Sequence, residues 1–214
     1  MTAITITLIY TNVLDVSHVG LTSQFSDCIH TCYQDLHCSS FFYGNDKCYT
    51  SKTFSNATPF TDSNDVNYYG WGVGDLCPEP FLYHKPTGQC LYGEWVNKRN
   101  YTSAVSFCDG VGGRLTVTDE SYKDKYLAAI GDARAATLWL GGKREGGSMT
   151  WLTGATVGPF TNWEADLSYR VEDCMIMSRV SHNWRTYNCS AEFRFMCEKI
   201  IPSANKPCGI LTTL

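Results

Sequence analysis

The chain has 214 residues, a net charge of -4 and an isoelectric point near 5.7. This charge gives no electrostatic reason to expect nucleic acid or an anionic membrane as a partner. Eleven cysteines predict an oxidising compartment, where disulfides stabilise small hydrophobic cores. We therefore expect an extracellular, secreted protein with two modest domains.

The N-terminal residues 1–10 (MTAITITLIY) have the pattern of a strand. Apolar Ile4, Ile6 and Leu8 alternate with threonines, which is the period of a half-buried strand. The segment lacks a basic flank and a small-residue cleavage site, so we expect a mature first strand, with any export signal removed or missing. No run reaches the roughly 20 apolar residues that a membrane-spanning helix needs.

A first cluster of cysteines follows, and it comprises Cys28, Cys32, Cys38 and Cys48. Cys28 and Cys32 are four residues apart on a predicted helix, which places both sulfurs on one helix face. Residues 40–43 (SFFY) predict an aromatic strand, and residues 44–46 (GND) predict a turn into a returning strand. From the residues alone, four cysteines allow three disulfide pairings.

The spacing C-x3-C-x5-C-x3-F-x5-C, with one strand before it and another after it, resembles a PAN/apple-like module over residues 1–75. The resemblance implies a helix packed on a sheet and the nested disulfides Cys28–Cys48 and Cys32–Cys38. The alternative is a zinc site built from these cysteines with His30 and His37. The C-x2-C spacing that is common in structural zinc sites is missing, which argues against this alternative.

Residues 76–199 carry a second series of landmarks. Helical spacing of apolar residues predicts helices at 100–108 and 118–130, and an apolar strand that ends in glycines follows at 138–142 (LWLGG). Three short motifs come next, PFTNW at 159–163, EDCM at 172–175 and FMCE at 195–198.

This ordered series resembles a C-type lectin domain in its long form, which has an extra N-terminal hairpin. The resemblance implies the disulfides Cys77–Cys90, Cys108–Cys197 and Cys174–Cys189. Both predicted domains fit a mixed α+β fold rather than a parallel α/β sheet. Residues 200–214 form a tail with an unpaired Cys208, which either links two chains in a disulfide-linked dimer or stays free.

A PAN/apple-like module in front of a lectin-like domain is similar to the secreted C-type lectin-like proteins of nematodes. That similarity implies carbohydrate recognition and a role in innate defence. The sequons at Asn56 and Asn100 predict a glycoprotein. We find no serine nucleophile elbow, no H-E-x-x-H and no phosphate-binding loop, so we expect a binding protein and not an enzyme.

In the resembled family, a calcium ion usually holds the sugar, because Ca²⁺ prefers oxygen ligands and sugar hydroxyls replace its waters. A Glu-Pro-Asn or Gln-Pro-Asp motif and an Asn-Asp pair after a tryptophan supply those ligands. Here Trp184 is followed by Arg185 and Thr186. Arg185 places a fixed cation where the metal would need an oxygen. We therefore expect no cofactor and no calcium at the usual sugar site.

The candidate ligand-binding residues are Glu164, Asp166, Tyr169, Glu172 and Arg185. Counting back from Cys174 places residues 164–166 (EAD) where Glu-Pro-Asn would lie, whereas counting forward from Trp163 makes the loop shorter and the motif absent. The acids at 164 and 166 are thus either remnants of a ligand set or solvated loop residues.

Glu172 matches a position that can contribute a calcium ligand in the family. Arg185 could instead form an ion pair with Glu164 or Glu172 and organise the loop in place of the ion. For sugar binding without calcium, Tyr169 and Arg185 are the surface candidates, and we expect the nearby tryptophans 163 and 184 in the core. The predicted partner is a glycan or a protein, and the alternative function is an adhesion or protein–protein interaction module without sugar binding.

Overall fold

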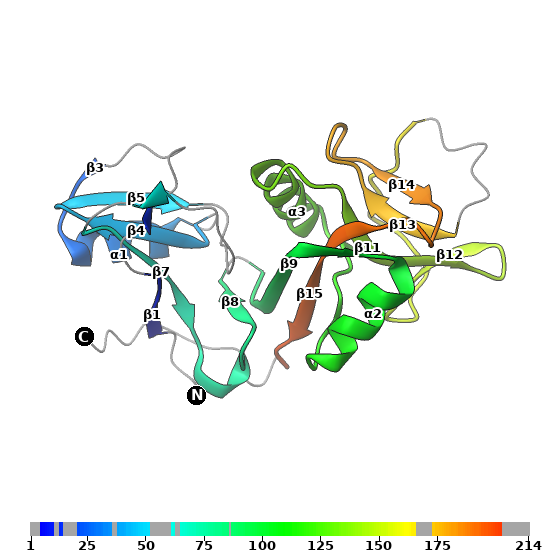
Figure 1. The fold of residues 1–214 in the computed structure, drawn as a ribbon, viewed down its shortest axis with the longest axis horizontal. Helices are drawn as coiled ribbons and strands as arrows, with labels where there is room; N and C mark the ends of the chain where they lie inside the picture. Colours follow the sequence, from blue (N-terminus) through cyan, green and yellow to red (C-terminus); the bar gives the residue numbers. More distant parts are fainter. Residues whose placement is uncertain are drawn as a thin grey trace. The chain divides into compact units, whose positions relative to one another are not determined.

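The computed structural model describes residues 5–10, 13–14, 21–35, 38–51, 61–62, 65–85, 87–165 and 173–202. The chain forms two compact units (Figure 1). One comprises Met1–Leu91 with Ile200–Leu214, and the other comprises Tyr92–Lys199. Both units mix helices and strands, so the α+β fold class is confirmed, while the domain limits 1–75, 76–199 and 200–214 remain predictions.

The first unit is an antiparallel sheet with one helix, α1 (Phe25–Gln34). The sheet runs in the order β9-β8-β7-β4-β5-β3, and β1 also pairs with β7. Its strands are β1 (Thr5–Tyr10), β3 (Leu21–Thr22), β4 (Ser40–Gly44), β5 (Lys47–Ser51), β7 (Asn67–Gly72), β8 (Leu82–His84) and the start of β9 (Gln89–Arg99). A separate pair is formed by β2 (Val13–Leu14) and β6 (Thr61–Asp62), and a 3₁₀ turn, η1, spans Gly74–Leu76.

The hairpin β4–β5 closes through a two-residue turn. Asn45 and Asp46 have φ values of 50° and 53°, the left-handed conformation that a type I′ turn requires at both positions. This turn places Phe41 on the face towards α1, where its ring stacks on Tyr69 at 5.2 Å. Phe25 of the helix lies 5.0 Å from Tyr69, so an aromatic layer joins the helix to the sheet.

Three disulfides lie in the first unit. Cys28–Cys48 ties α1 to β5, Cys32–Cys38 ties α1 to the segment before β4, and Cys77–Cys90 ties the end of η1 to β9. All four N-terminal cysteines are therefore oxidised, and the zinc alternative is wrong. The C-terminal end of α1 also has a cationic cap, because the Lys85 ammonium donates hydrogen bonds to the carbonyls of Cys32, Tyr33 and Asp35 at 2.9, 2.6 and 3.0 Å.

The second unit has a mixed sheet in the order β14-β13-β11-β15-β9, in which β11 pairs with β15 in parallel and with β13 in the antiparallel direction. Figure 1 shows its two helices on either side of β15. The helices are α2 (Tyr101–Gly110) and α3 (Ser121–Ala133). The strands after β9 are β10 (Arg114–Leu115), β11 (Leu138–Glu145), β12 (Ser148–Trp151), β13 (Cys174–Met177), β14 (Trp184–Tyr187) and β15 (Phe193–Ile200).

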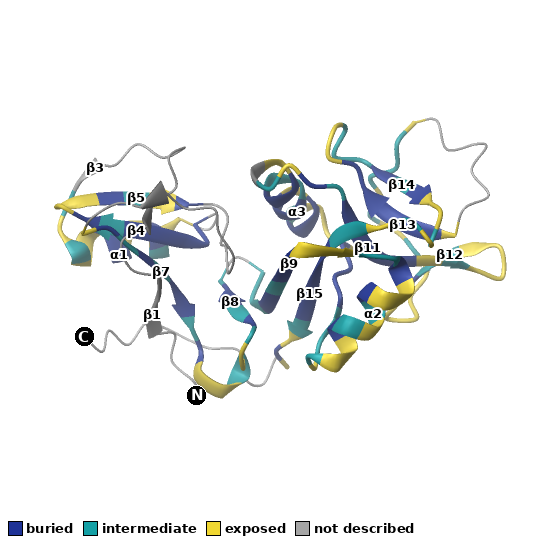
Figure 2. Ribbon diagram, in the orientation of Figure 1, coloured by how far each residue is buried: buried dark blue, intermediate teal, exposed yellow. Residues whose placement is uncertain are grey.

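The core of this unit lies along β11 and β13. All four residues of β13 are buried, whereas the tip of the β11–β12 hairpin is exposed (Figure 2). Cys108–Cys197 joins α2 to β15, and Cys174–Cys189 joins β13 to the segment after β14. The second of these disulfides fixes β13 to the segment after β14, and the candidate site is built beside these two strands.

A buried cluster of charges joins three elements of the same unit. Glu198 of β15 is fully buried, and its carboxylate pairs with Lys123 of α3 and, at 2.8 Å, with Arg114 of β10. Lys123 is buried as well, and Arg114 keeps 28% of its side chain exposed. Each carboxylate oxygen therefore has a cationic partner, as burial of a charge requires.

Candidate functional site

A pocket of about 620 Å³ lies in the second unit. Its wall comes from the β11–β12 hairpin, from the segment 156–165 and from β14. The residues that line it are Arg144, Ser148, Met149, Thr156, Val157, Trp163, Glu164, Ala165 and Thr186. Its size falls within the range of roughly 300–1,000 Å³ that is typical of small-molecule sites.

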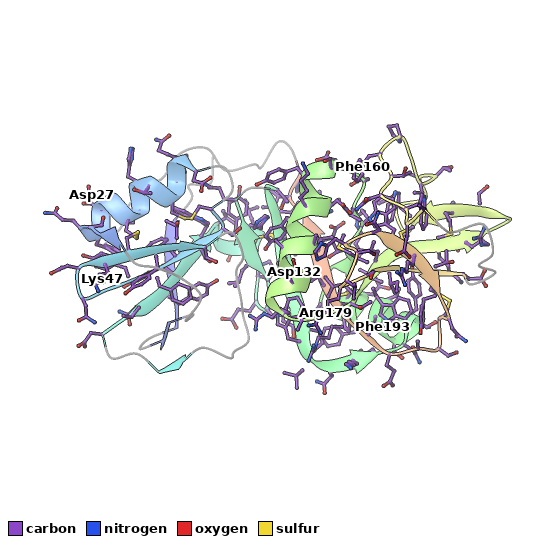
Figure 3. All side chains as sticks on the ribbon, turned by 90° about the horizontal axis from the view of Figure 1, so that it is seen from above. Asp27, Lys47, Asp132, Phe160, Arg179 and Phe193 are labelled. Atoms are coloured by element: carbon purple, nitrogen blue, oxygen red, sulfur yellow. A yellow bond between two sulfur atoms is a disulfide. The ribbon has the colours of Figure 1, made fainter. Side chains whose placement is uncertain are left out.

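Trp184 anchors the segment that forms one wall of the pocket. This tryptophan is fully buried, and the rings of Trp151, Phe160 and Trp163 meet it edge-on at 5.4, 5.6 and 5.5 Å (Figure 3 labels Phe160). Two backbone hydrogen bonds flank the contact, from the Trp184 N–H to the Asn162 carbonyl at 2.7 Å and from the Glu164 N–H to the Trp184 carbonyl at 3.0 Å. The segment 160–164 is therefore held on β14.

Asp124 of α3 is the polar anchor beneath this segment. Its carboxylate accepts hydrogen bonds from the Trp184 indole at 2.6 Å, from the Asn162 amide at 2.8 Å and from the Thr118 hydroxyl at 3.3 Å. Burial raises the pKa of Asp124, and the three hydrogen bonds oppose this rise. The sequence predicted the helix but not this role, because nothing in the helical pattern distinguishes Asp124 from a solvated acid.

Arg185 and Glu164 form a two-pronged ion pair. Arg185 Nη2 donates to Glu164 Oε1, while Arg185 Nε faces Glu164 Oε2. The two side chains are 31% and 25% exposed. Of the two partners that the sequence suggested for Arg185, Glu172 lies outside the described residues, and Glu164 is paired with it. Both oxygens of this carboxylate are engaged by the guanidinium, so a metal could take them only by displacing Arg185.

Two buried side-chain polar atoms of the pocket lining have no hydrogen-bond partner among the described residues. One is the hydroxyl of Thr186, whose residue is only 3% exposed. The other is Nε of Arg144, a buried atom that lies 4.0 Å from Asp173 Oδ1. Buried polar groups are usually paired, so two unpaired groups in one pocket are a specific feature of this site. The sequence alone could not predict that these two residues lie in one pocket, since their positions are 42 apart in the chain.

Trp163 differs from the sequence prediction. We expected both tryptophans of this stretch in the core, and Trp184 confirms this, but Trp163 is only partly buried and lines the pocket. The reason is that the Trp184 ring already occupies the space above Asp124. The Trp163 ring therefore packs edge-on against Trp184 and faces the pocket.

The other predicted site residues divide into two groups. Asn100 is the N-cap of α2, where its side-chain oxygen accepts a hydrogen bond from the Ser103 N–H at 2.9 Å. The remaining ones lie outside the described residues, and they are Asp166, Tyr169, Glu172, Asn56 and Cys208. Within the described ranges, no group of three or more His, Cys, Asp or Glu side chains could hold a metal ion.

Residues 97–199 match the sequence model of the family described as the Lectin C-type domain. No curated protein matches the chain. Similar solved structures include the carbohydrate-recognition domain of the mouse scavenger receptor C-type lectin, which is 22% identical with a TM-score of 0.50, over 59% of this chain and 100% of that one. Another is the C-type carbohydrate-recognition domain of cow CD23, which is 20% identical with a TM-score of 0.51, over 59% and 97% of the two chains.

A Ca²⁺-dependent type II antifreeze protein in its Ca²⁺-free form is 20% identical with a TM-score of 0.50, over 58% of this chain and 100% of that one. Together with the family match, these likenesses show that the second unit has a C-type lectin fold. The five disulfides are consistent with an extracellular protein. No helix in the described part of the chain is long and apolar enough to cross a membrane.

Proposed function

We propose that this protein is an extracellular recognition protein whose lectin-like domain binds a glycan at the pocket without calcium. The observation that carries the proposal is the ion pair between Arg185 and Glu164. Lectin-like domains of the resembled family place oxygen ligands for calcium after the tryptophan of this strand. Here the guanidinium takes that position and neutralises the nearest acid in the described part of the loop.

The electrostatics support this proposal. A calcium ion beside Arg185 would meet a fixed positive charge, and it would have to break the ion pair before Glu164 could serve as a ligand. The pocket offers other means of holding a sugar. Trp163 provides a partly exposed ring, and Arg144 and Thr186 provide hydrogen-bonding groups that have no partner of their own.

A glycan array run with calcium and again with chelator tests the proposal. We expect the same glycans to bind in both conditions. Binding that chelator abolishes would show that a calcium site survives, and the proposal would be wrong. If no glycan binds and a pull-down recovers a protein ligand, the domain is an adhesion module instead.

A double variant sharpens the test. Arg185→Asn with Thr186→Asp places the family's Asn-Asp pair after Trp184. We expect this variant to lose calcium-independent binding, because Glu164 loses its cationic partner and the pocket gains an uncompensated negative charge, while the backbone hydrogen bonds of the segment 160–164 to β14 remain. Arg179→Gln is the matched control, because Arg179 is exposed and does not line the pocket (labelled in Figure 3).

We propose further that the first unit is a PAN/apple-like module. A helix packed on an antiparallel sheet and the nested disulfides of α1 support this proposal. Secretion, similarity to nematode lectin-like proteins, innate defence, N-glycosylation at Asn56 and Asn100, and a dimer through Cys208 are further parts of it. Mass spectrometry of the exported protein before and after reduction and deglycosylation tests the two glycosylation sites and the dimer through Cys208.

A further inference from the structure

We infer that the pocket selects a sugar that carries an acidic group, a carboxylate or a sulfate. This inference rests on the proposed function, and it adds the chemical class of the ligand. Three features of the described pocket carry it, the free hydrogen-bonding capacity of Arg144, the unpaired hydroxyl of Thr186, and the neutralised charge of Glu164.

Arg144 supplies the positive charge. It lies near the end of β11, and its Nε is buried without a hydrogen bond. Its ion-pair partner among the described residues is Asp173, whose Oδ1 lies 4.0 Å from Arg144 Nε and whose side chain is 55% exposed. Such a long, solvated ion pair contributes little. A guanidinium has five donors in a planar fork, which suits the paired oxygens of a carboxylate or sulfate.

Thr186 supplies the second polar contact. Its backbone is fixed in β14 opposite Met175, its side chain is buried, and its hydroxyl has no partner among the described residues. A buried hydroxyl without a partner costs free energy, which a bound hydroxyl or acidic oxygen would recover. The hydroxyl can donate or accept, so it can pair with either group of an acidic sugar.

The acid that lines the pocket does not oppose an anion. Glu164 is held by Arg185 through both of its oxygens, so its negative charge is compensated at short range. Arg144 is therefore the lining cation whose charge is not taken up by a close ion pair within the described residues. An anion entering the pocket would meet a net attraction from Arg144.

The remaining wall suits the sugar ring. Trp163, Met149 and Val157 give an apolar surface, against which the C–H face of a pyranose can pack. With a volume of about 620 Å³, the pocket has room for a small saccharide. The inferred ligand thus packs its ring on Trp163 while its acidic group faces Arg144.

Calorimetry on the full chain with matched sugar pairs tests this inference. The pairs are glucuronate against glucose and galactose 6-sulfate against galactose, so the carboxylate and the sulfate are tested separately. We expect at least one acidic sugar to bind about tenfold more tightly than its neutral partner, as a charge-assisted contact predicts. Arg144→Gln should reduce this preference to less than about twofold, while Arg179→Gln should keep it.

Thr186→Val removes the hydroxyl and keeps the shape of the side chain, so it should weaken binding of the acidic sugar about fivefold, and an unchanged affinity would contradict the contact with this hydroxyl. Melting temperatures show that each variant is folded. Equal affinity for acidic and neutral sugars, unchanged by Arg144→Gln, would overturn the inference and leave the proposed function intact. If none of these sugars binds the wild-type chain, the inference fails, and the glycan array alone decides the proposed function.

Discussion

Replacing Asp124 by alanine is the most informative perturbation of the lectin-like domain. The carboxylate accepts three hydrogen bonds, and two of their donors, the Trp184 indole and the Asn162 amide, hold the pocket segment. In the alanine variant the Trp184 N–H is left buried without a partner, whereas Asn162 still donates to the His182 carbonyl at 3.0 Å. One orphaned donor and two weakened contacts predict a loss of about 2–4 kcal/mol in the free energy of unfolding.

Urea unfolding followed by tryptophan fluorescence measures this loss. The matched control is Asp109→Ala, because Asp109 is an exposed acid on α2, and we expect it to change the free energy of unfolding by less than about 0.5 kcal/mol. Asp124→Asn should cost less than Asp124→Ala, since the amide oxygen can still accept from Trp184. A cost below about 0.5 kcal/mol for Asp124→Ala would refute the anchoring role of this carboxylate.

Three further substitutions test interactions within each of the two units. Glu198→Ala should cost about 3–5 kcal/mol in urea unfolding, because it leaves Lys123 buried without its carboxylate; a loss under about 1 kcal/mol would contradict the buried charge cluster. Tyr101→Phe should be neutral or stabilising by up to about 1 kcal/mol, since the buried phenol oxygen has no partner among the described residues; a clear loss of stability would reveal a hydrogen bond. Lys85→Gln should lower the stability of the first unit by about 1 kcal/mol in thermal unfolding, because α1 loses its cationic cap, while the exposed Lys47→Gln should not.

The sequence predicted the lectin-like fold well, because its landmarks are local. A short window of residues is enough to predict the apolar first half of β11, the helix with Cys108 and the buried strand that begins at Cys174. The predicted strand ended at its two glycines, Gly141 and Gly142, whereas β11 continues to Glu145 because it pairs with β12. Their fixed order along the chain then selects the fold. The same holds for the hairpin of the first unit, whose Asn45-Asp46 turn follows from residues that accept a positive φ.

The candidate site could be predicted only in part. Arg185 was identified because it directly follows Trp184, and Glu164 was one of the two partners that the sequence suggested for it, although 21 positions separate the two residues. Arg144 and Thr186 line the same pocket because of how β11 and β14 are placed in the sheet. A single sequence does not contain that information. Asp124 was missed for the same reason, since two of its three partners, Asn162 and Trp184, lie 38 and 60 residues away in the chain.

The dissociation constant of one glycan, chosen from the array and measured in calcium and then in chelator, tests the central proposal most directly. If Arg185 and Glu164 organise the loop in place of a metal, the two values should agree within about twofold, and Trp163→Ala should weaken both alike. A loss of tenfold or more in chelator, on the order of 1.4 kcal/mol, would contradict calcium-independent binding at this pocket.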